Sequence, residues 1–395
     1  MSNIDKNSIK ILKERGVQIK FFVGLPGSGK EEVCSKLEKE YGFTYFNIEV
    51  LIENEVQSNN TFSSQIKKCL DDHVEVADEL QLSILIRYLV NSQKKYFLVS
   101  NFPKTLNQAL IIEEELCEIG CLIHFNLPKT IFDQKPTNLS RDIEYDLYNT
   151  KTLPMIDFYN QFGLVREVDC SKNFNSVLTS AKEEILPEIY CIIGKKYSGK
   201  TTVSNVFNEQ MNFELIDFSK FLNLPEITRK KQDDQYVIIE LINRLRQSNS
   251  RRVMIENFPQ NENQYKIFIS NAKKIKNIFY LKTEDYICSE RMIAFGKDNE
   301  NYIGSSKLRE EIDRFNSFNA AIFLGKVPSL IREFEMNNYF KIDIRNFMNQ
   351  IKPKILMIGN DQECLDLKNR IVDHYIQKEG FKIVNVSLFF IILGK

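Results

Sequence analysis

The sequence has no excess of either charge, because its 53 lysines and arginines are balanced by 53 aspartates and glutamates. A chain without net charge generates no overall field that would attract nucleic acid or an anionic membrane surface. We therefore expect neither of these partners. Any anion that the protein binds must be held by a local arrangement of residues.

Metal, disulfide and membrane motifs are also absent. None of the eight cysteines belongs to a CxxC pair, and His73, His124 and His374 lack metal-ligand spacing and acidic partners. This argues against a zinc site and a disulfide framework and favours a reducing compartment. The chain has no uninterrupted run of about 18 apolar residues, and its first residues are polar. We expect a cytoplasmic protein.

An internal repeat is the first positive feature. An apolar run that ends in glycine occurs at residues 21–24, 191–194 and 356–359. Each run is followed by a polar, helix-like stretch and then by a second short apolar segment. A strand, loop, helix and strand that recur at similar distances indicate a repeated structural unit.

The first two repeats continue in parallel beyond this point. Both contain Asn-Phe-Pro with a glutamine five residues after the proline, in FLVSNFPKTLNQ (97–108) and VMIENFPQNENQ (253–264). A further strand is expected at 121–128 and 277–284, and a closing strand at 164–169 and 339–343.

Short apolar strands that alternate with helical stretches predict an α/β fold of tandem units, each with a parallel central sheet covered by helices. The chain of 395 residues is long enough for two or three such domains. We place an N-terminal extension at 1–14, the first repeat at 15–187, the second repeat at 188–351 and a partial third at 352–395.

The third repeat is short. Residues 381–390 correspond to 43–52 of the first repeat, and the sequence ends soon afterwards with an apolar stretch at 389–392. Half a sheet cannot bury such a stretch by itself. We expect it to dock on the second repeat or on another chain, or else the coding sequence to be truncated.

The second repeat contains GKKYSGKTT (194–202), a complete GxxxxGK[ST] motif between a strand and a helical stretch. Glycines let backbone amides converge on phosphates, Lys200 reaches the outer phosphates, and the Thr201 hydroxyl can meet Mg²⁺. The motif predicts ATP and Mg²⁺ binding; the alternative is an ordinary glycine-rich turn. The residues expected to bind ATP are Gly194, Ser198, Gly199, Lys200, Thr201 and Thr202.

The corresponding loop of the first repeat, GLPGSGKEE (24–32), has Glu31 and Glu32 in place of the two threonines. Carboxylates at a helix N-terminus compete with a phosphate for the same amides and also repel it. We expect a retained turn that does not turn over ATP, with weak nucleotide binding as the alternative. The residues in question are Gly24, Gly27, Ser28, Gly29 and Lys30. The third loop lacks the second glycine and the lysine, and we expect it to be inert.

These motifs, in this order and over nearly the whole chain, resemble the adenylate kinase family of nucleoside monophosphate kinases. Tandem, partly degenerate units are similar to its multi-domain members associated with cilia and flagella. The resemblance implies P-loop kinase-like units that use ATP with Mg²⁺ and a monophosphate acceptor, AMP above all. It also implies axonemal protein partners and a place in the cilium or flagellum.

For the acceptor, the resemblance assigns AMP binding to Pro103 with Gln108 and to Pro259 with Gln264. The family's arginine after this proline is absent, because Lys104 and Gln260 stand there. Two further positions differ between the repeats. The acidic residue that orients the Mg²⁺ shell is Glu256 in the second repeat and Ser100 in the first. In the first repeat's monophosphate helix, Glu53 replaces another AMP arginine.

The lid favours the second repeat. Ser289-Glu-Arg-Met and Arg314-Phe-Asn resemble the family's lid segments, which makes Arg291 and Arg314 catalytic candidates beside Lys200. Arginines that close over a transferring phosphoryl group stabilise its charge. The alternative is two solvated helix arginines. The first repeat has Gln134 and Leu147 at these places.

Two functions of different class follow. The first is a nucleoside monophosphate kinase whose working centre lies in the second repeat. The second is a non-catalytic scaffold or nucleotide sensor that keeps the fold in a larger assembly such as an axoneme. A GTPase is disfavoured, because no Asn-Lys-x-Asp motif follows either loop.

Overall fold

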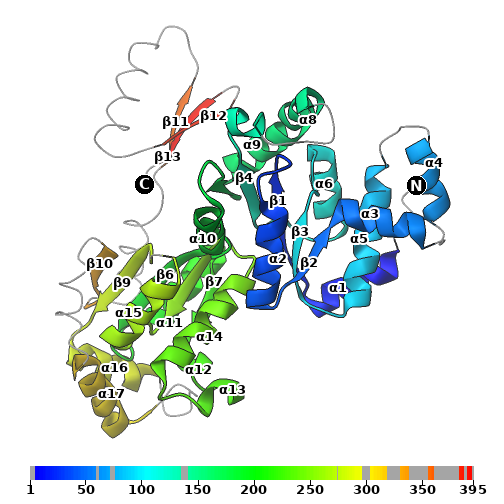
Figure 1. The fold of residues 1–395 in the computed structure, drawn as a ribbon. Coiled ribbons are helices and arrows are strands. Elements are labelled where there is room, and N and C mark those ends of the chain that lie inside the picture. Colours follow the sequence, from blue (N-terminus) through cyan, green and yellow to red (C-terminus); the bar gives the residue numbers. More distant parts are fainter. Residues whose placement is uncertain are drawn as a thin grey trace. The chain divides into compact units, whose positions relative to one another are not determined.

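The computed structural model describes residues 5–58, 62–71, 76–134, 141–273, 275–295, 303–317, 330–337, 355–359, 382–386 and 389–393. Figure 1 labels the helices and strands along the chain. The chain divides into two compact units. One holds residues 1–194, 200–280 and 310–332, and the other holds residues 195–199, 281–309 and 333–395.

The first sheet has five strands in the order β2-β3-β1-β4-β5. Parallel ladders join β1 to β3 and β4, β2 to β3, and β4 to β5. This is the parallel α/β architecture that the alternation of strands and helices predicts. The strands are β1 (Gln18–Gly24), β2 (Thr44–Asn47), β3 (Tyr96–Ser100), β4 (Leu122–Asn126) and β5 (Val165–Asp169). The helices are α1 (Lys6–Arg15), α2 (Lys30–Tyr41), α3 (Ile48–Gln57), α4 (Ser63–Asp71), α5 (Asp78–Ser92), α6 (Leu106–Glu115), α7 (Lys129–Phe132), α8 (Arg141–Leu147), the π-helical turn η1 (Tyr148–Thr152), α9 (Leu153–Gln161) and α10 (Phe174–Glu184).

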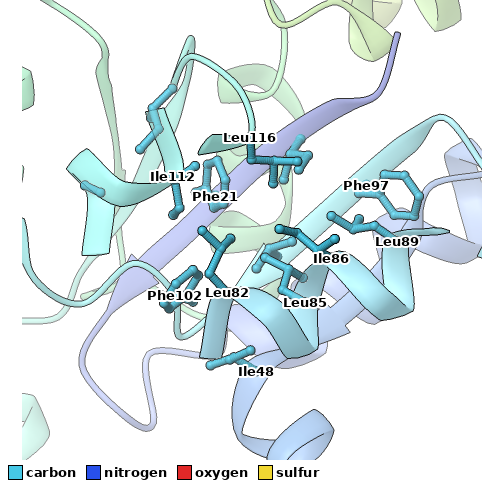
Figure 2. Packing of buried hydrophobic residues seen from close by; sticks show 14 of the residues in the cluster. Phe21, Ile48, Leu82, Leu85, Ile86, Leu89, Phe97, Phe102, Ile112 and Leu116 are labelled. Carbon is cyan, nitrogen blue, oxygen red and sulfur yellow. The ribbon is translucent and has the colours of Figure 1, made fainter. Parts of the chain in front are cut away.

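Both faces of the first sheet are buried. Side chains of β1 alternate between them, so that Phe21 belongs to one hydrophobic cluster and Phe22 to another. Figure 2 shows the first cluster, where Leu82, Leu85 and Ile86 from α5 pack with Phe21. A strand covered on both faces reads as a continuous apolar run, which is why β1 is conspicuous in the sequence.

Replacing Leu85 with alanine is expected to lower the free energy of unfolding by about 2–5 kcal/mol, because Leu85 is fully buried and its truncation leaves a cavity. Denaturant unfolding of the full chain, followed by circular dichroism, measures the change. The matched control is Leu110→Ala on α6, whose leucine is 47% exposed and should cost less than about 0.5 kcal/mol. Equal losses for the two variants would contradict this assignment of the core.

The second sheet also has five strands, in the order β10-β9-β6-β8-β7. The order from β9 through β6 and β8 to β7 repeats that from β4 through β1 and β3 to β2, and parallel ladders join β8 to β6 and β7. The strands are β6 (Glu188–Gly194), β7 (Glu214–Asp217), β8 (Arg252–Glu256), β9 (Asn277–Lys282) and β10 (Ile331–Glu335). The helices are α11 (Lys200–Met211), α12 (Phe218–Phe221), α13 (Pro225–Thr228), α14 (Asp234–Gln247), α15 (Glu262–Asn271), α16 (Asp285–Phe295) and α17 (Ser305–Ser317).

The edge strand of this sheet, β10, was not expected from the sequence. The strand that follows β9 is Ile331–Glu335, whereas the closing strand was expected at 339–343, which lies outside the described residues. β10 carries Arg332, Glu333 and Glu335, and only Phe334 among its residues is buried. A strand with one buried residue has no apolar run, so hydrophobicity alone does not reveal it.

The C-terminal segment departs from the repeat. β11 (Ile355–Gly359), β12 (Lys382–Val386) and β13 (Phe389–Leu393) form a three-stranded sheet in the order β11-β13-β12. Both pairings of β13 are antiparallel. The apolar stretch at 389–392 thus finds backbone partners within its own segment, which the sequence analysis does not anticipate. The expected inert loop after residue 359 and the helical stretch expected to follow it lie outside the described residues. Among the described helices none is long and apolar enough to span a membrane.

Candidate active site

The loop between β6 and α11 places Lys200 at the first position of the helix, as the motif predicts. Its side chain is buried, and Nζ donates to the carbonyl oxygen of Gly194 at 2.8 Å. The loop therefore carries a positioned cation at a helix N-terminus, the arrangement that favours phosphate.

Thr201 and Glu256 come together at the same end of the sheet. The Thr201 hydroxyl donates to a carboxylate oxygen of Glu256 at 2.6 Å, and Glu256 is the last residue of β8. Hydroxyl and carboxylate oxygens are ligands that Mg²⁺ accepts, directly or through its water molecules. The structure thus brings together the two residues that sequence analysis assigned to Mg²⁺, although they lie 55 positions apart.

The side chain of Ser198 bears on whether the loop could bind a phosphate group. Its side chain is fully buried, and its hydroxyl finds no hydrogen-bond partner in the part of the chain that the structure describes. A buried hydroxyl without a partner is unfavourable. A phosphate oxygen in the loop would supply an acceptor. Ser28 of the first loop is in the same state, so both loops keep this feature.

The backbone of the two loops agrees at a position where the sequences differ. Gly27 has φ +74°, and Tyr197, three residues before Lys200 as Gly27 is before Lys30, has φ +63°. A tyrosine in this left-handed region costs roughly 1–2 kcal/mol relative to glycine. The second loop therefore holds the phosphate-loop conformation against local strain.

Arg291 on α16 lies against the loop. Its guanidinium donates to the carbonyl oxygens of Tyr197 at 3.4 Å, Ser198 at 3.3 Å and Met336 at 2.7 Å. Lys195, in the same loop, donates from Nζ to the carbonyl oxygen of Thr283 at 3.1 Å and to a carboxylate oxygen of Asp285 at 2.5 Å. The structure thus brings one predicted lid arginine to the phosphate loop, where it fixes the loop backbone.

Arg314 is placed differently. It lies near the end of α17 with its side chain 73% exposed, and it pairs with Glu311 at 3.2 Å. This is the surface i,i+3 ion pair of an exposed helix. Its catalytic role stays a prediction.

The first loop has an internal counter-ion. Lys30 is 1% exposed, and its Nζ lies 2.8 Å from a carboxylate oxygen of Glu31. Burial by itself would raise the pKa of Glu31, but the Lys30 ammonium and hydrogen bonds from Lys30 and Asn101 leave it below the ordinary value of 4.5. The lysine that would contact a phosphate is already paired with a carboxylate. This opposes phosphate binding more strongly than the sequence alone indicated.

A second carboxylate extends this arrangement. Asn101 donates to Glu49 at 2.9 Å and to Glu31 at 3.4 Å, and Lys104 pairs with Glu49 at 2.6 Å. Lys104 is the residue that stands in place of the family's AMP arginine. Both lysines at the nucleotide positions of the first repeat are therefore matched by glutamates of the chain. Sequence analysis missed Glu49; its signal was the pair of acidic residues, Glu49 and Glu53, at the start of α3.

The two predicted acceptor glutamines have structural partners. Gln108 Nε2 donates to Asp78 at 2.8 Å, and its oxygen accepts from the amide of Lys104 at 2.6 Å. In the second repeat Gln264 donates to Asp234 at 2.9 Å, and its oxygen accepts from the amide of Gln260 at 3.0 Å. Through these two contacts, each glutamine links the backbone just after Pro103 or Pro259 to the aspartate that begins α5 or α14. Binding of the acceptor by these residues stays a prediction.

The double change Glu31→Gly and Glu32→Thr is expected to raise the affinity of the first repeat for MgATP at least about tenfold, because it frees Lys30 and restores a hydroxyl. Calorimetric titration in the Lys200→Ala background isolates the first loop. Adding Lys30→Ala should remove the gain. The double variant should not gain turnover, since the first repeat lacks the lid arginines; unchanged affinity would show that the glutamates are not the obstacle.

The Glu31 carboxylate should also make stability depend on pH. Its pKa is lowered by folding, so its contribution is complete above the ordinary value of 4.5 and is lost as the pH falls through the lowered value. The full chain should therefore exceed Glu31→Gln in unfolding free energy at pH 7, and the difference should shrink as the pH falls below 4.5 and through the lowered pKa. A difference that grows on acidification would refute the ion pair. Denaturant unfolding at several pH values measures it.

Comparison with known proteins adds to this geometry. The family model described as adenylate kinase matches residues 22–164, which lie in the first repeat. The chain is 25% identical over 225 residues to UMP-CMP kinase 1 of Oryza sativa subsp. japonica, covering 54% of this chain and 91% of that protein. It is 26% identical to adenylate kinase 1 of Schistosoma mansoni (42% and 91%) and 28% identical to UMP-CMP kinase of Bos taurus (40% and 92%).

Proposed function

Because the chain contains a domain of the adenylate kinase family, we propose that it is a nucleoside monophosphate kinase that converts ATP and a nucleoside monophosphate to ADP and a nucleoside diphosphate. We propose further that the second repeat (188–351) is the catalytic centre. The first repeat (15–187), although it carries the family match, has the adenylate kinase fold without turnover. These boundaries, with the extension at 1–14 and the partial unit from 352, are part of the proposal.

The observation that carries the proposal is the contrast between the two loop lysines. Lys30 is paired with a glutamate of its own loop at 2.8 Å, whereas Lys200 is held by a backbone carbonyl at 2.8 Å. The Lys30 ammonium thus lies against a carboxylate of its own loop, whereas the contact with Gly194 places the Lys200 ammonium at the helix N-terminus, where phosphate binds. Electrostatic stabilisation dominates phosphoryl transfer, so this difference separates a working loop from a retained one.

Different residues of the second repeat have different roles in the proposed reaction. Lys200 and the loop amides bind the transferring phosphate, and Arg291 fixes the loop backbone through its carbonyls. Thr201 and Glu256 would hold Mg²⁺ or its water molecules. The metal, when bound, offsets the negative charge of the phosphates.

The acceptor is a nucleoside monophosphate. We propose AMP first, with UMP and CMP as the next to be tried, because the similar proteins are named adenylate kinases and UMP-CMP kinases. Gln264 and Pro259 border its site in the proposal. The arginines that the family uses for the acceptor phosphate are absent from this sequence, so its binding should be weak.

The test is an assay of ADP formation by the full chain from ATP with AMP, UMP or CMP. Activity that exceeds ATP hydrolysis without acceptor supports the kinase. Its absence with all three acceptors would favour a catalytically inert scaffold or nucleotide sensor, for example in a cilium or axoneme. The exposed position of Arg314 and the missing acceptor arginines are the observations that favour this second candidate.

A further inference from the structure

A cavity of about 450 Å³ opens in the first repeat, beside α3. Its wall is apolar and includes Ile48, Ile52, Val56 and Val76. Ile48, Ile52 and Val56 recur every four residues and so share one face of the helix. This volume is within the range of small-molecule pockets, whose linings are apolar with a few polar groups.

The charged groups of the cavity do not suit a phosphate. Its lining includes Glu49, Glu53 and Lys104. The lysine is paired with Glu49 at 2.6 Å, and Asn101 donates to the same carboxylate at 2.9 Å. The lining thus has two carboxylates and one ammonium, and the ammonium is already paired.

Glu53 carries the negative charge of the cavity lining that Lys104 does not balance. It lies one helical turn beyond Glu49, is exposed, and has no hydrogen bond or ion pair with the described residues. An apolar wall with one unbalanced carboxylate at its edge attracts a ligand whose body is apolar and whose end is positive. It repels a ligand of the same shape whose end is negative.

We propose that this cavity binds a small organic cation with an apolar body, and that it discriminates against phosphate-bearing ligands. The site is separate from the second phosphate loop and does not depend on the proposed kinase activity. The first repeat would then be a ligand-binding module with reversed charge preference. Glu53 would be the residue that sets that preference, while the face of α3 would bind the apolar body.

Three probes with one apolar body and different ends test this. They are 4-phenylbutylamine, 4-phenylbutanol and 4-phenylbutyrate, titrated into the full chain by calorimetry with saturation-transfer NMR as a second readout. The amine is expected to bind about tenfold more tightly than the carboxylate, with the alcohol between them. Glu53→Gln should bring the amine to the affinity of the alcohol.

The controls keep the proposal falsifiable. Glu14→Gln on α1 removes an exposed carboxylate outside the cavity lining and should leave the order of affinities unchanged. Ile52→Asp should weaken the alcohol as well as the carboxylate, because it puts a charge in the apolar wall. The proposal is overturned if the carboxylate binds as tightly as the amine, if Glu53→Gln has no effect, or if the amine shows no saturable binding up to the millimolar range.

Discussion

Replacing Lys200 with alanine is expected to lower the kcat of ATP-dependent phosphoryl transfer by about a hundredfold or more. Loss of a positioned cation at a transferring phosphate typically removes a few kcal/mol of transition-state stabilisation. The side chain is buried at the start of α11 with its ammonium on the carbonyl of Gly194. Initial rates of ADP formation by the full chain, with saturating ATP and each acceptor, measure the effect.

Lys30→Ala is the matched control, because Lys30 begins α2 as Lys200 begins α11. Its ammonium is already paired with Glu31, so turnover should change by less than about twofold. Circular dichroism of both variants shows whether they are folded. If Lys30→Ala abolished turnover and Lys200→Ala did not, the catalytic centre would lie in the first repeat and the proposed assignment would be reversed.

Arg291→Ala should have the second largest effect, a fall in kcat/KM of about thirty- to a hundredfold. Three carbonyl oxygens lose a charged donor, at Tyr197, Ser198 and Met336. Hydrogen bonds from a charged group contribute about 1.5–3 kcal/mol each when buried. The freed loop has further reason to relax, because Tyr197 has a strained positive φ.

Two companion variants distinguish a role in holding the loop from charge alone. Arg291→Lys keeps the positive charge but cannot present several donors in a fixed plane, so it should recover only a small part of the activity. Arg314→Ala, at an exposed arginine paired with Glu311, should cost less than about threefold if that residue stays on the surface during turnover. A loss comparable with that of Arg291→Ala would instead support the lid role that the sequence suggested for Arg314.

Several features could be predicted from the sequence because they depend on short-range patterns. An apolar run followed by glycine and a polar helical stretch predicted β1 with α2 and β6 with α11. The Asn-Phe-Pro repeat marked corresponding positions in the two repeats, and Asn101 and Asn257 share a positive φ of 61° and 62°. The phosphate loop, its lysine and its threonine could also be predicted from the sequence, because the motif is one contiguous stretch and the residues expected to bind phosphate belong to it.

Only the tertiary structure decided which charges meet. Glu49 contacts Lys104, 55 residues away, and Gln108 contacts Asp78, 30 residues away, pairings that depend on how α3, α5 and the turn after β3 pack on one sheet. The edge strand β10 and the antiparallel β13 likewise depend on backbone partners rather than on side-chain periodicity. The sequence determined the repeated fold and the place of both phosphate loops, whereas the packing of distant segments determined that Lys104 meets Glu49 and that Thr201 meets Glu256, because electrostatic pairing follows distance in space.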